Sequence, residues 1–169
     1  MAPTRVLGID PGTALTGYAV VEEEEDRLHL ITIGVVDTPA RMSLPVRLQR
    51  IYTGLRAVVT EYTPEAAAVE QLFFSRNTRT AMTVGEARGV VLLAMADAGL
   101  SIAEYTPMQI KQAVTGYGSA DKRQVQEMVR VLLALPDIPR PDDAADAAAV
   151  AICYLHRARL DGLLETQGA

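Results

Sequence analysis

Three strand-like segments open the chain with no helix between them, and helical and strand-like segments then alternate. The first three are residues 6–10, 15–21 and 28–37; two more follow at 66–72 and 101–105. Segments with helical periodicity occupy 44–62, 78–98, 108–114, 120–135 and 142–160, and Ser119 and Asp142 are the expected N-caps of the last two. Short turns join antiparallel strands, whereas a helix between two strands favours parallel pairing. The sequence therefore predicts an α/β fold with a mixed five-stranded sheet flanked by helices.

The length of 169 residues predicts a single domain over residues 1–169, with residues 161–169 as a frayed tail. No apolar run is long enough to cross a bilayer, so no membrane association is expected. The first residues lead straight into a strand-like segment without a signal-peptide pattern, and the single Cys153 cannot form an internal disulfide. These features predict a cytoplasmic protein.

The net charge of −5 disfavours a nucleic-acid partner only at first sight. Five of the acids form one run, residues 22–26, between two predicted strands, where a solvated hairpin tip is expected. Outside this run, 16 acidic residues stand against 16 basic ones. Local patches therefore decide the choice of partner.

Four carboxylates lie next to strongly apolar segments. Asp10 ends the apolar run 6–9, Glu70 ends the run 66–69, and Asp143 and Asp146 open an apolar helix. Each has an ordinary interpretation. Asp10 precedes Pro-Gly as a turn former would, Glu70 can extend from a strand edge to water, and acids in a first helical turn interact favourably with the helix dipole.

Taken together, the four acids indicate a metal site. Residues three apart share a helix face, so Asp143 and Asp146 point the same way. With two acids at strand ends they offer hard oxygen ligands, which suit Mg²⁺ or Mn²⁺; no His or Cys cluster suggests zinc. Two such ions can activate a water and stabilise a leaving 3′-oxygen, which is the chemistry of phosphodiester hydrolysis.

Several motifs resemble the RuvC family of bacterial Holliday junction resolvases. They are LGIDPGT at 7–13 with TGY at 16–18, AVEQLFF at 68–74, PMQIKQAV at 107–114 with GYGSADK at 116–122, and DAADA at 143–147. The matches occur in order and extend from residue 7 to about residue 156.

The resemblance implies a ribonuclease H-like fold and a homodimer that cuts four-way DNA junctions by paired nicks in strands of like polarity. The expected products carry 5′-phosphate and 3′-OH ends, and the expected role is in homologous recombination and DNA repair. It also implies the branch-migration proteins RuvA and RuvB as partners. Its catalytic acids, which hold the two metal ions, match Asp10, Glu70, Asp143 and Asp146, although the family also accepts His at the position of Asp143. Its functional lysines match Lys111 and Lys122.

Candidate DNA contacts follow from the same segments. The chain has 14 arginines but only two lysines, Lys111 and Lys122, and a compact ammonium suits a phosphate where a guanidinium does not fit. Phe73 matches an aromatic residue of the family that engages junction bases, and Phe74 is its neighbour. Arg76 and Arg79 follow as candidate phosphate contacts. The alternatives are core packing for both Phe residues and ordinary surface arginines.

A stripe of small residues lies on the segment 78–98. Ala81, Gly85 and Gly89 recur every four residues, and glycine weakens a helix by about 1 kcal/mol relative to alanine. The stripe therefore indicates close approach of another backbone. Either a second subunit, as the resemblance implies, or packing within the monomer accounts for it.

Three other functions are compatible with parts of the sequence. The motif at 10–13 also resembles the phosphate loop of actin-like ATPases, but these need two related lobes and this chain is too short. Another ribonuclease H-like nuclease, such as one that cuts RNA–DNA hybrids or a relative of RuvC that acts on RNA, shares the acids. The segment 111–122 favours the junction enzyme. A non-catalytic junction-binding module would have no use for four desolvated carboxylates.

Overall fold

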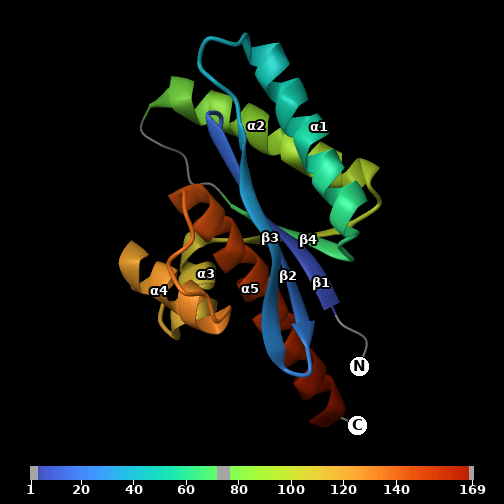
Figure 1. Ribbon diagram of the computed structural model, residues 1–169, viewed down its shortest axis with the longest axis vertical. Helices are drawn as coiled ribbons and strands as arrows, with labels where there is room; N and C mark the ends of the chain where they lie inside the picture. Colours follow the sequence, from blue (N-terminus) through green and yellow to red (C-terminus); the bar gives the residue numbers. More distant parts are fainter. Residues whose placement is uncertain (1–3, 72–76, 168–169) are drawn as a thin grey trace.

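One mixed sheet organises the molecule (Figure 1). The computed structural model describes residues 4–71 and 77–167. Within them the strand order is β3-β2-β1-β4-β5; β1 pairs antiparallel with β2 and parallel with β4. The predicted five-stranded mixed sheet is confirmed. The strands are β1 Thr4–Asp10, β2 Leu15–Glu24, β3 Arg27–Asp37, β4 Ala66–Glu70 and β5 Ser101–Tyr105, and the helices are α1 Leu44–Tyr62, α2 Thr78–Asp97, α3 Pro107–Thr115, α4 Lys122–Leu132 and α5 Asp142–Gln167.

The acidic run lies at the β2–β3 hairpin, as expected, but most of it belongs to strand β2. Only Glu25 and Asp26 form the turn, both with positive φ (49° and 64°), which suits a two-residue hairpin. Arg159 of α5 approaches the hairpin, with Nη2 3.1 Å from Asp26 Oδ1 and Nη1 3.7 Å from Glu23 Oε1. The run is therefore partly neutralised by α5.

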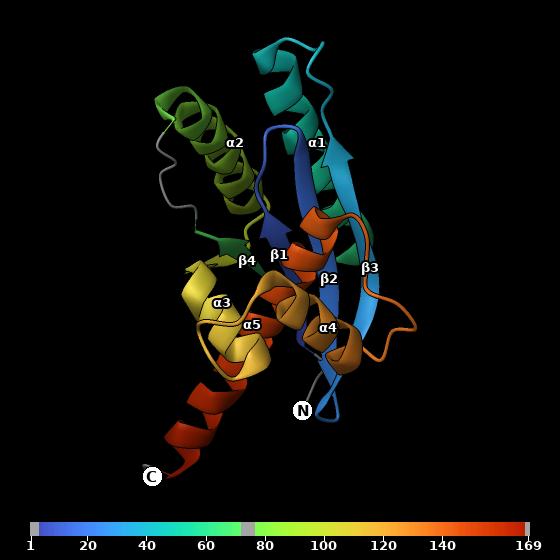
Figure 2. The same cartoon turned by 90° about the vertical axis from the view of Figure 1, so that its left-hand side faces the viewer.

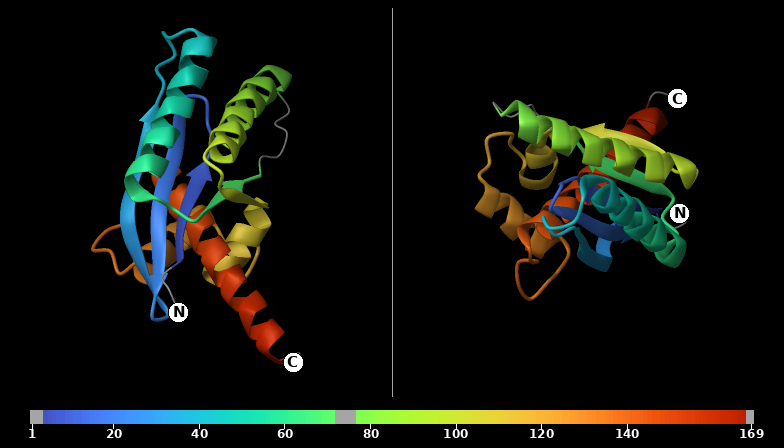
Figure 3. Two further views of the ribbon diagram at one scale, coloured as in Figure 1. Left: turned by 90° about the vertical axis from the view of Figure 1, so that its right-hand side faces the viewer. Right: turned by 90° about the horizontal axis from the view of Figure 1, so that it is seen from above.

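Helices cover both faces of the sheet (Figures 2 and 3). Helices α1 and α2 pack against one face, and α5, backed by α3 and α4, packs against the other. The alternation along β1 explains this arrangement: Leu7 and Ile9 enter the core under α1 and α2, whereas Val6 lies in the core under α5. Asp10 has the parity of Val6, so its side chain is on the α5 face.

Glycines in the strands allow α5 to lie directly on the sheet. A Cβ on Gly8 would be 2.1 Å from the carbonyl oxygen of Ala147, and one on Gly17 would be 1.9 Å from that of Asp143. Real Cβ atoms do not approach backbone so closely. The alanine-rich face of α5 and these two glycines together place the first turns of the helix against β1 and β2.

Several helix and strand boundaries differ from the sequence expectations. Helix α4 is capped by Asp121 rather than Ser119, because Asp121 and Gln124 form a reciprocal capping box. Helix α5 includes Asp142 as its first residue, so Asp142 does not cap it; the carbonyl of Pro141 accepts the bonds from Ala144 and Ala145. Strand β4 ends at Glu70, two residues earlier than expected.

Helix α5 also continues to Gln167, beyond the expected end near residue 160, and its last turns project from the body of the molecule (Figure 1). Leu163, Leu164 and Glu165 are good helix formers beyond Leu160, and no proline interrupts the chain before residue 167. Fraying of residues 161–169 stays a prediction. None of the helices in the described part of the chain is long and apolar enough to cross a membrane.

Candidate active site

Two acidic residues meet at the ends of adjacent central strands. Ile9 pairs with Val69 in the parallel β1–β4 ladder, and Asp10 and Glu70 follow as the last residue of each strand. Both share the parity of the residues that pack under α5. The two carboxyl groups share a hydrogen bond, so the structure brings these two predicted site residues into contact.

The first turns of α5 add the other two acids. Gly17 is the register partner of Asp10 on β2, and the backbone of Asp143 lies against it. Asp146 follows one turn later and is half-buried. Both carboxylates act electrostatically on Asp10, as does Glu70, so all four predicted acids gather in one cluster.

Burial and mutual repulsion make this cluster hard to ionise. Burial, reinforced by the charges of Glu70, Asp146 and Asp143, raises the pKa of Asp10 to about 9. Burial also raises the pKa of Glu70, against the hydrogen bond from Asp10, which lowers it. Burial likewise raises the pKa of Asp146, and the positive charge of Lys122 partly offsets that rise. The three shifts all oppose full ionisation of the cluster.

The two lysines line one pocket together with two of the four acids. A pocket of about 240 Å³ is lined by Glu70 and Asp146 together with Lys111 from α3 and Lys122 from α4. Lys122 Nζ lies 3.6 Å from Asp146 Oδ2 and 3.2 Å from Asp142 Oδ2. Burial lowers the pKa of Lys122, but the two carboxylates outweigh that effect and raise it overall. The segment from α3 to α4 thus delivers both lysines to the carboxylates.

The donor set fits a divalent cation. Four carboxylates supply hard oxygen ligands in a partly buried site whose like charges repel one another. Within residues 4–71 and 77–167, no group of three or more His, Cys, Asp or Glu side chains is already arranged to hold a metal ion. Rotation of the acids toward one another, with Lys122 moving off Asp146, would complete such a site.

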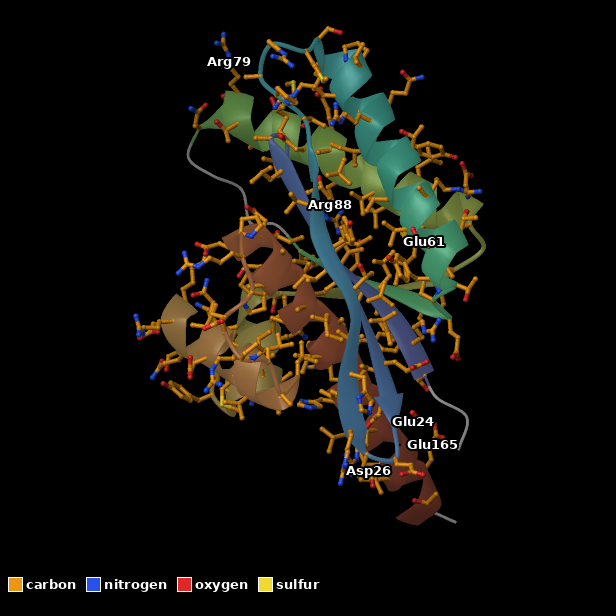
Figure 4. All side chains as sticks on the ribbon, viewed as in Figure 1. Glu24, Asp26, Glu61, Arg79, Arg88 and Glu165 are labelled. Atoms are coloured by element: carbon orange, nitrogen blue, oxygen red, sulfur yellow. The ribbon has the colours of Figure 1, made fainter. Side chains whose placement is uncertain are left out.

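The predicted DNA contacts have different outcomes. Phe73, Phe74 and Arg76 lie outside the described residues. Arg79 is exposed in the first turn of α2 and points away from the molecule (Figure 4). It does not line the pocket of the acids and lysines.

The sequence reasoning missed several residues that position the site. Thr16 and Thr38 are fully buried and hold the turn after Asp10: Thr16 Oγ1 donates to Gly12 O at 2.8 Å, and Thr38 Oγ1 donates to Thr13 O. Gly8 and Gly17 allow α5 to pack closely on the sheet. Glycine inside an apolar strand signals close backbone approach, so these two were detectable beforehand. The sequence predicts only a helix cap at Asp142, whereas its side chain contacts Lys122.

The sheet order and the acid-bearing ends of its central strands define the class of protein as a ribonuclease H-like nuclease fold. The sequence pattern of the family described as "Crossover junction endodeoxyribonuclease RuvC" matches residues 6–154. This chain therefore belongs to the RuvC family of crossover junction endodeoxyribonucleases. Nucleases of this family depend on a metal ion.

Individual relatives agree with that assignment. A RuvC from Syntrophomonas wolfei is 55% identical over 162 residues, covering 96% of this chain and 94% of the relative. One from Heliobacterium modesticaldum is 60% identical over 151 residues, covering 89% and 93%. Among solved structures, Thermus thermophilus RuvC in complex with Holliday junction substrate superposes with a TM-score of 0.89 at 40% identity, covering 94% of this chain and 96% of that one.

Proposed function

We propose that this chain resolves four-way DNA junctions by paired nicks in strands of like polarity, in homologous recombination and repair. The observation that carries the proposal is the cluster of Asp10, Glu70, Asp143 and Asp146 with Lys111 and Lys122 at its rim. Membership of the RuvC family and the fold likeness to a junction-bound relative support the four-way junction as substrate. Residues 1–169 would form one nuclease domain.

Asp10, Glu70, Asp143 and Asp146 would hold two Mg²⁺ ions, with Mn²⁺ as a substitute. Bound there, the ions would supply activation of the attacking water and stabilisation of the leaving 3′-oxygen, which leaves 5′-phosphate and 3′-OH ends. Burial and the neighbouring carboxylates raise the pKa of Asp10, which supports this assignment because a divalent cation relieves the repulsion among the acids.

The chain's own residues orient the DNA and balance its charge. Lys111 and Lys122 approach the pocket from α3 and α4, where their ammonium groups would contact the phosphate to be cut. Thr16 and Thr38 hold the backbone turn after Asp10, so that carboxyl keeps its position beside Glu70. Phe73 is proposed to engage junction bases, with Phe74, Arg76 and Arg79 as further DNA contacts.

A two-fold dimer would present two such sites to the symmetric strands of a junction. Helix α2 is the proposed interface. A Cβ on Gly85 or Gly89 would meet nothing within 4 Å, and Met82 (68%) and Leu93 (54%) on the same helix are strongly exposed. Packing within the described part of the monomer therefore does not account for the small residues at 85 and 89.

Gly89→Arg is expected to convert the dimer to a monomer, because a long charged side chain would prevent close approach of a second α2. The fold should remain intact, since the site is open and arginine favours a helix more than glycine does, by up to about 1 kcal/mol. Sedimentation equilibrium measures the change. Gly162→Arg is the matched control, because Gly162 lies on an open face of α5, and it should remain dimeric. A dimeric Gly89→Arg variant would place the interface elsewhere.

Association with RuvA and RuvB and a cytoplasmic location complete the proposal. Both follow from the family resemblance and from the sequence features above.

Cleavage assays on paired substrates test the function. A synthetic four-way junction and a linear duplex with the sequence of one of its arms are incubated with the protein and Mg²⁺. We expect the junction to be cut and the duplex to stay intact. Equal cleavage of both would indicate a nuclease without junction selectivity, and no cleavage across several junction sequences would refute the proposal.

A further inference from the structure

Lys122 contacts two carboxylates, and only Asp146 belongs to the predicted ligand set. The other is Asp142, whose Oδ2 lies 3.2 Å from Lys122 Nζ. Its second oxygen, Oδ1, accepts a hydrogen bond from Gln126 Nε2 at 3.1 Å. Lys122 and Gln126 are one turn apart on α4, so they share a helix face. Both oxygens of Asp142 are therefore engaged by α4.

Asp146 is engaged differently. Its Oδ2 is 3.6 Å from Lys122 Nζ, and its side chain is 31% exposed, against 60% for Asp142. The more buried acid is thus the more distant of the two from the ammonium, and it lies deeper in the cluster. A cation that binds Asp146 would displace Lys122 from that carboxylate but not from Asp142.

We propose that Asp142 is a positioning residue that retains Lys122 at the rim of the active site when a divalent cation takes Asp146. This inference rests on the proposed nuclease function. Asp142 provides the second anchor of Lys122, and Gln126 holds that anchor in place. The ammonium then stays within reach of the phosphate to be cut instead of moving into solvent.

The exposure of the pair suits a transient anchor. The Lys122 side chain is 56% exposed and Asp142 is 60% exposed, and exposed ion pairs are weak. Asp142 can therefore keep the ammonium nearby without competing strongly with a DNA phosphate. A fully buried pair would hold Lys122 too firmly for this role.

Lysine NMR tests the retention without DNA or activity. The chain has only two lysines, so full-length protein labelled at lysine Cε gives two signals, and Lys111→Arg assigns them. Mg²⁺ is then titrated into the wild type and into Asp142→Asn. In the wild type, the Lys122 signal should shift but stay distinct from that of a free lysine. In Asp142→Asn, Mg²⁺ should move it to the free-lysine position. Identical Lys122 signals in the two proteins at every Mg²⁺ concentration would overturn the inference.

Junction cleavage provides the second arm. Asp142→Asn should lower kcat about tenfold while junction affinity, measured with Ca²⁺ in place of Mg²⁺, stays within about twofold. Asp142→Glu should restore most of kcat, because it keeps the anchor. Asp137→Asn removes the same charge from the exposed segment before α5 and should leave kcat unchanged. Equal losses in Asp142→Asn and Asp137→Asn, or wild-type kcat in Asp142→Asn, would contradict the role.

The two arms separate this inference from the proposed function. Wild-type protein that shows the expected lysine signals but cuts no junction would refute the function and leave the anchor standing. Junction cleavage by the wild type, with Lys122 signals in Asp142→Asn identical to those of the wild type, would support the proposed function and overturn the role of Asp142.

Discussion

Asp10→Asn is expected to abolish junction cleavage and, at the same time, to stabilise the protein. Loss of the central carboxylate removes a metal ligand, and metal ions supply several kcal/mol of transition-state stabilisation, so the rate should fall by about 10³-fold or more. The amide is nearly isosteric and its Nδ2 can still donate to Glu70. The fold should therefore survive the substitution.

The stability gain follows from the raised pKa of Asp10. An acid whose pKa rises from 3.8 in the unfolded chain to about 9 in the folded protein makes folding less favourable as the pH increases through that interval. One pKa unit corresponds to about 1.36 kcal/mol, which gives about 2 to 4 kcal/mol at pH 7 after allowance for the coupling with Glu70. Asparagine does not titrate and escapes this penalty.

Urea unfolding with EDTA present, at several pH values, measures the effect. Asp10→Asn should exceed the wild type in stability at pH 7 to 8, and the two should converge near pH 4. Mg²⁺ should raise the melting temperature of the wild type more than that of the variant. Asp37→Asn, an exposed acid at the end of β3, is the control and should change neither property. A variant less stable than the wild type at pH 8 would show that Asp10 is not repelled by its neighbours.

Gly17→Ala is expected to damage the active site from a position that has no reactive group. The new Cβ would be 1.9 Å from the carbonyl oxygen of Asp143 and 2.4 Å from its carbonyl carbon, so the start of α5 must move. Overpacking of this kind costs about 1 to 3 kcal/mol, and a displacement of about 1 Å at a catalytic group lowers the rate about 10²-fold. The loss of activity should exceed what partial unfolding explains.

Gly34→Ala is the matched strand control. The three atoms nearest to its Cβ would all belong to the side chain of Tyr18, which can move, and not to the backbone. Circular dichroism gives the folded fraction and single-turnover cleavage gives the rate. We expect folded Gly17→Ala to cut about 10²-fold more slowly than folded Gly34→Ala. Equal rates would mean that cleavage does not depend on the close packing of α5 on β2.

The sheet and the positions of the four acids could be predicted because each depends on local patterns. The continuous apolar run 6–9 predicted a central strand, and the acid that ends it lies where that strand ends. Helix starts at Asp121 and Asp142 were less predictable. Ser119 and Asp121 both favour an N-cap position, and the local capping box with Gln124 selects Asp121. Asp142 has the side chain of an N-cap residue but is the first residue of α5.

The partners of Lys122 could not be predicted either. Lys122 and Asp142 are separated by helix α4 and a proline-rich connector, so their contact depends on how α4 docks against α5. The close packing of α5 on the sheet could be predicted in part. Gly8 and Gly17 indicate in the sequence that another backbone approaches the strands, but only the structure identifies that backbone as α5.

Mapping of the nicks in a labelled junction tests the central claim most directly. Each strand of a synthetic four-way junction is labelled in turn at its 5′ end, and the protein is added with Mg²⁺. We predict two nicks at symmetric positions in strands of like polarity, with 5′-phosphate and 3′-OH ends that a ligase reseals. Asp146→Asn should bind the junction without cutting it. Unpaired nicks, ends that cannot be ligated, or undiminished cleavage by Asp146→Asn would contradict the assignment of these carboxylates to a junction-resolving site.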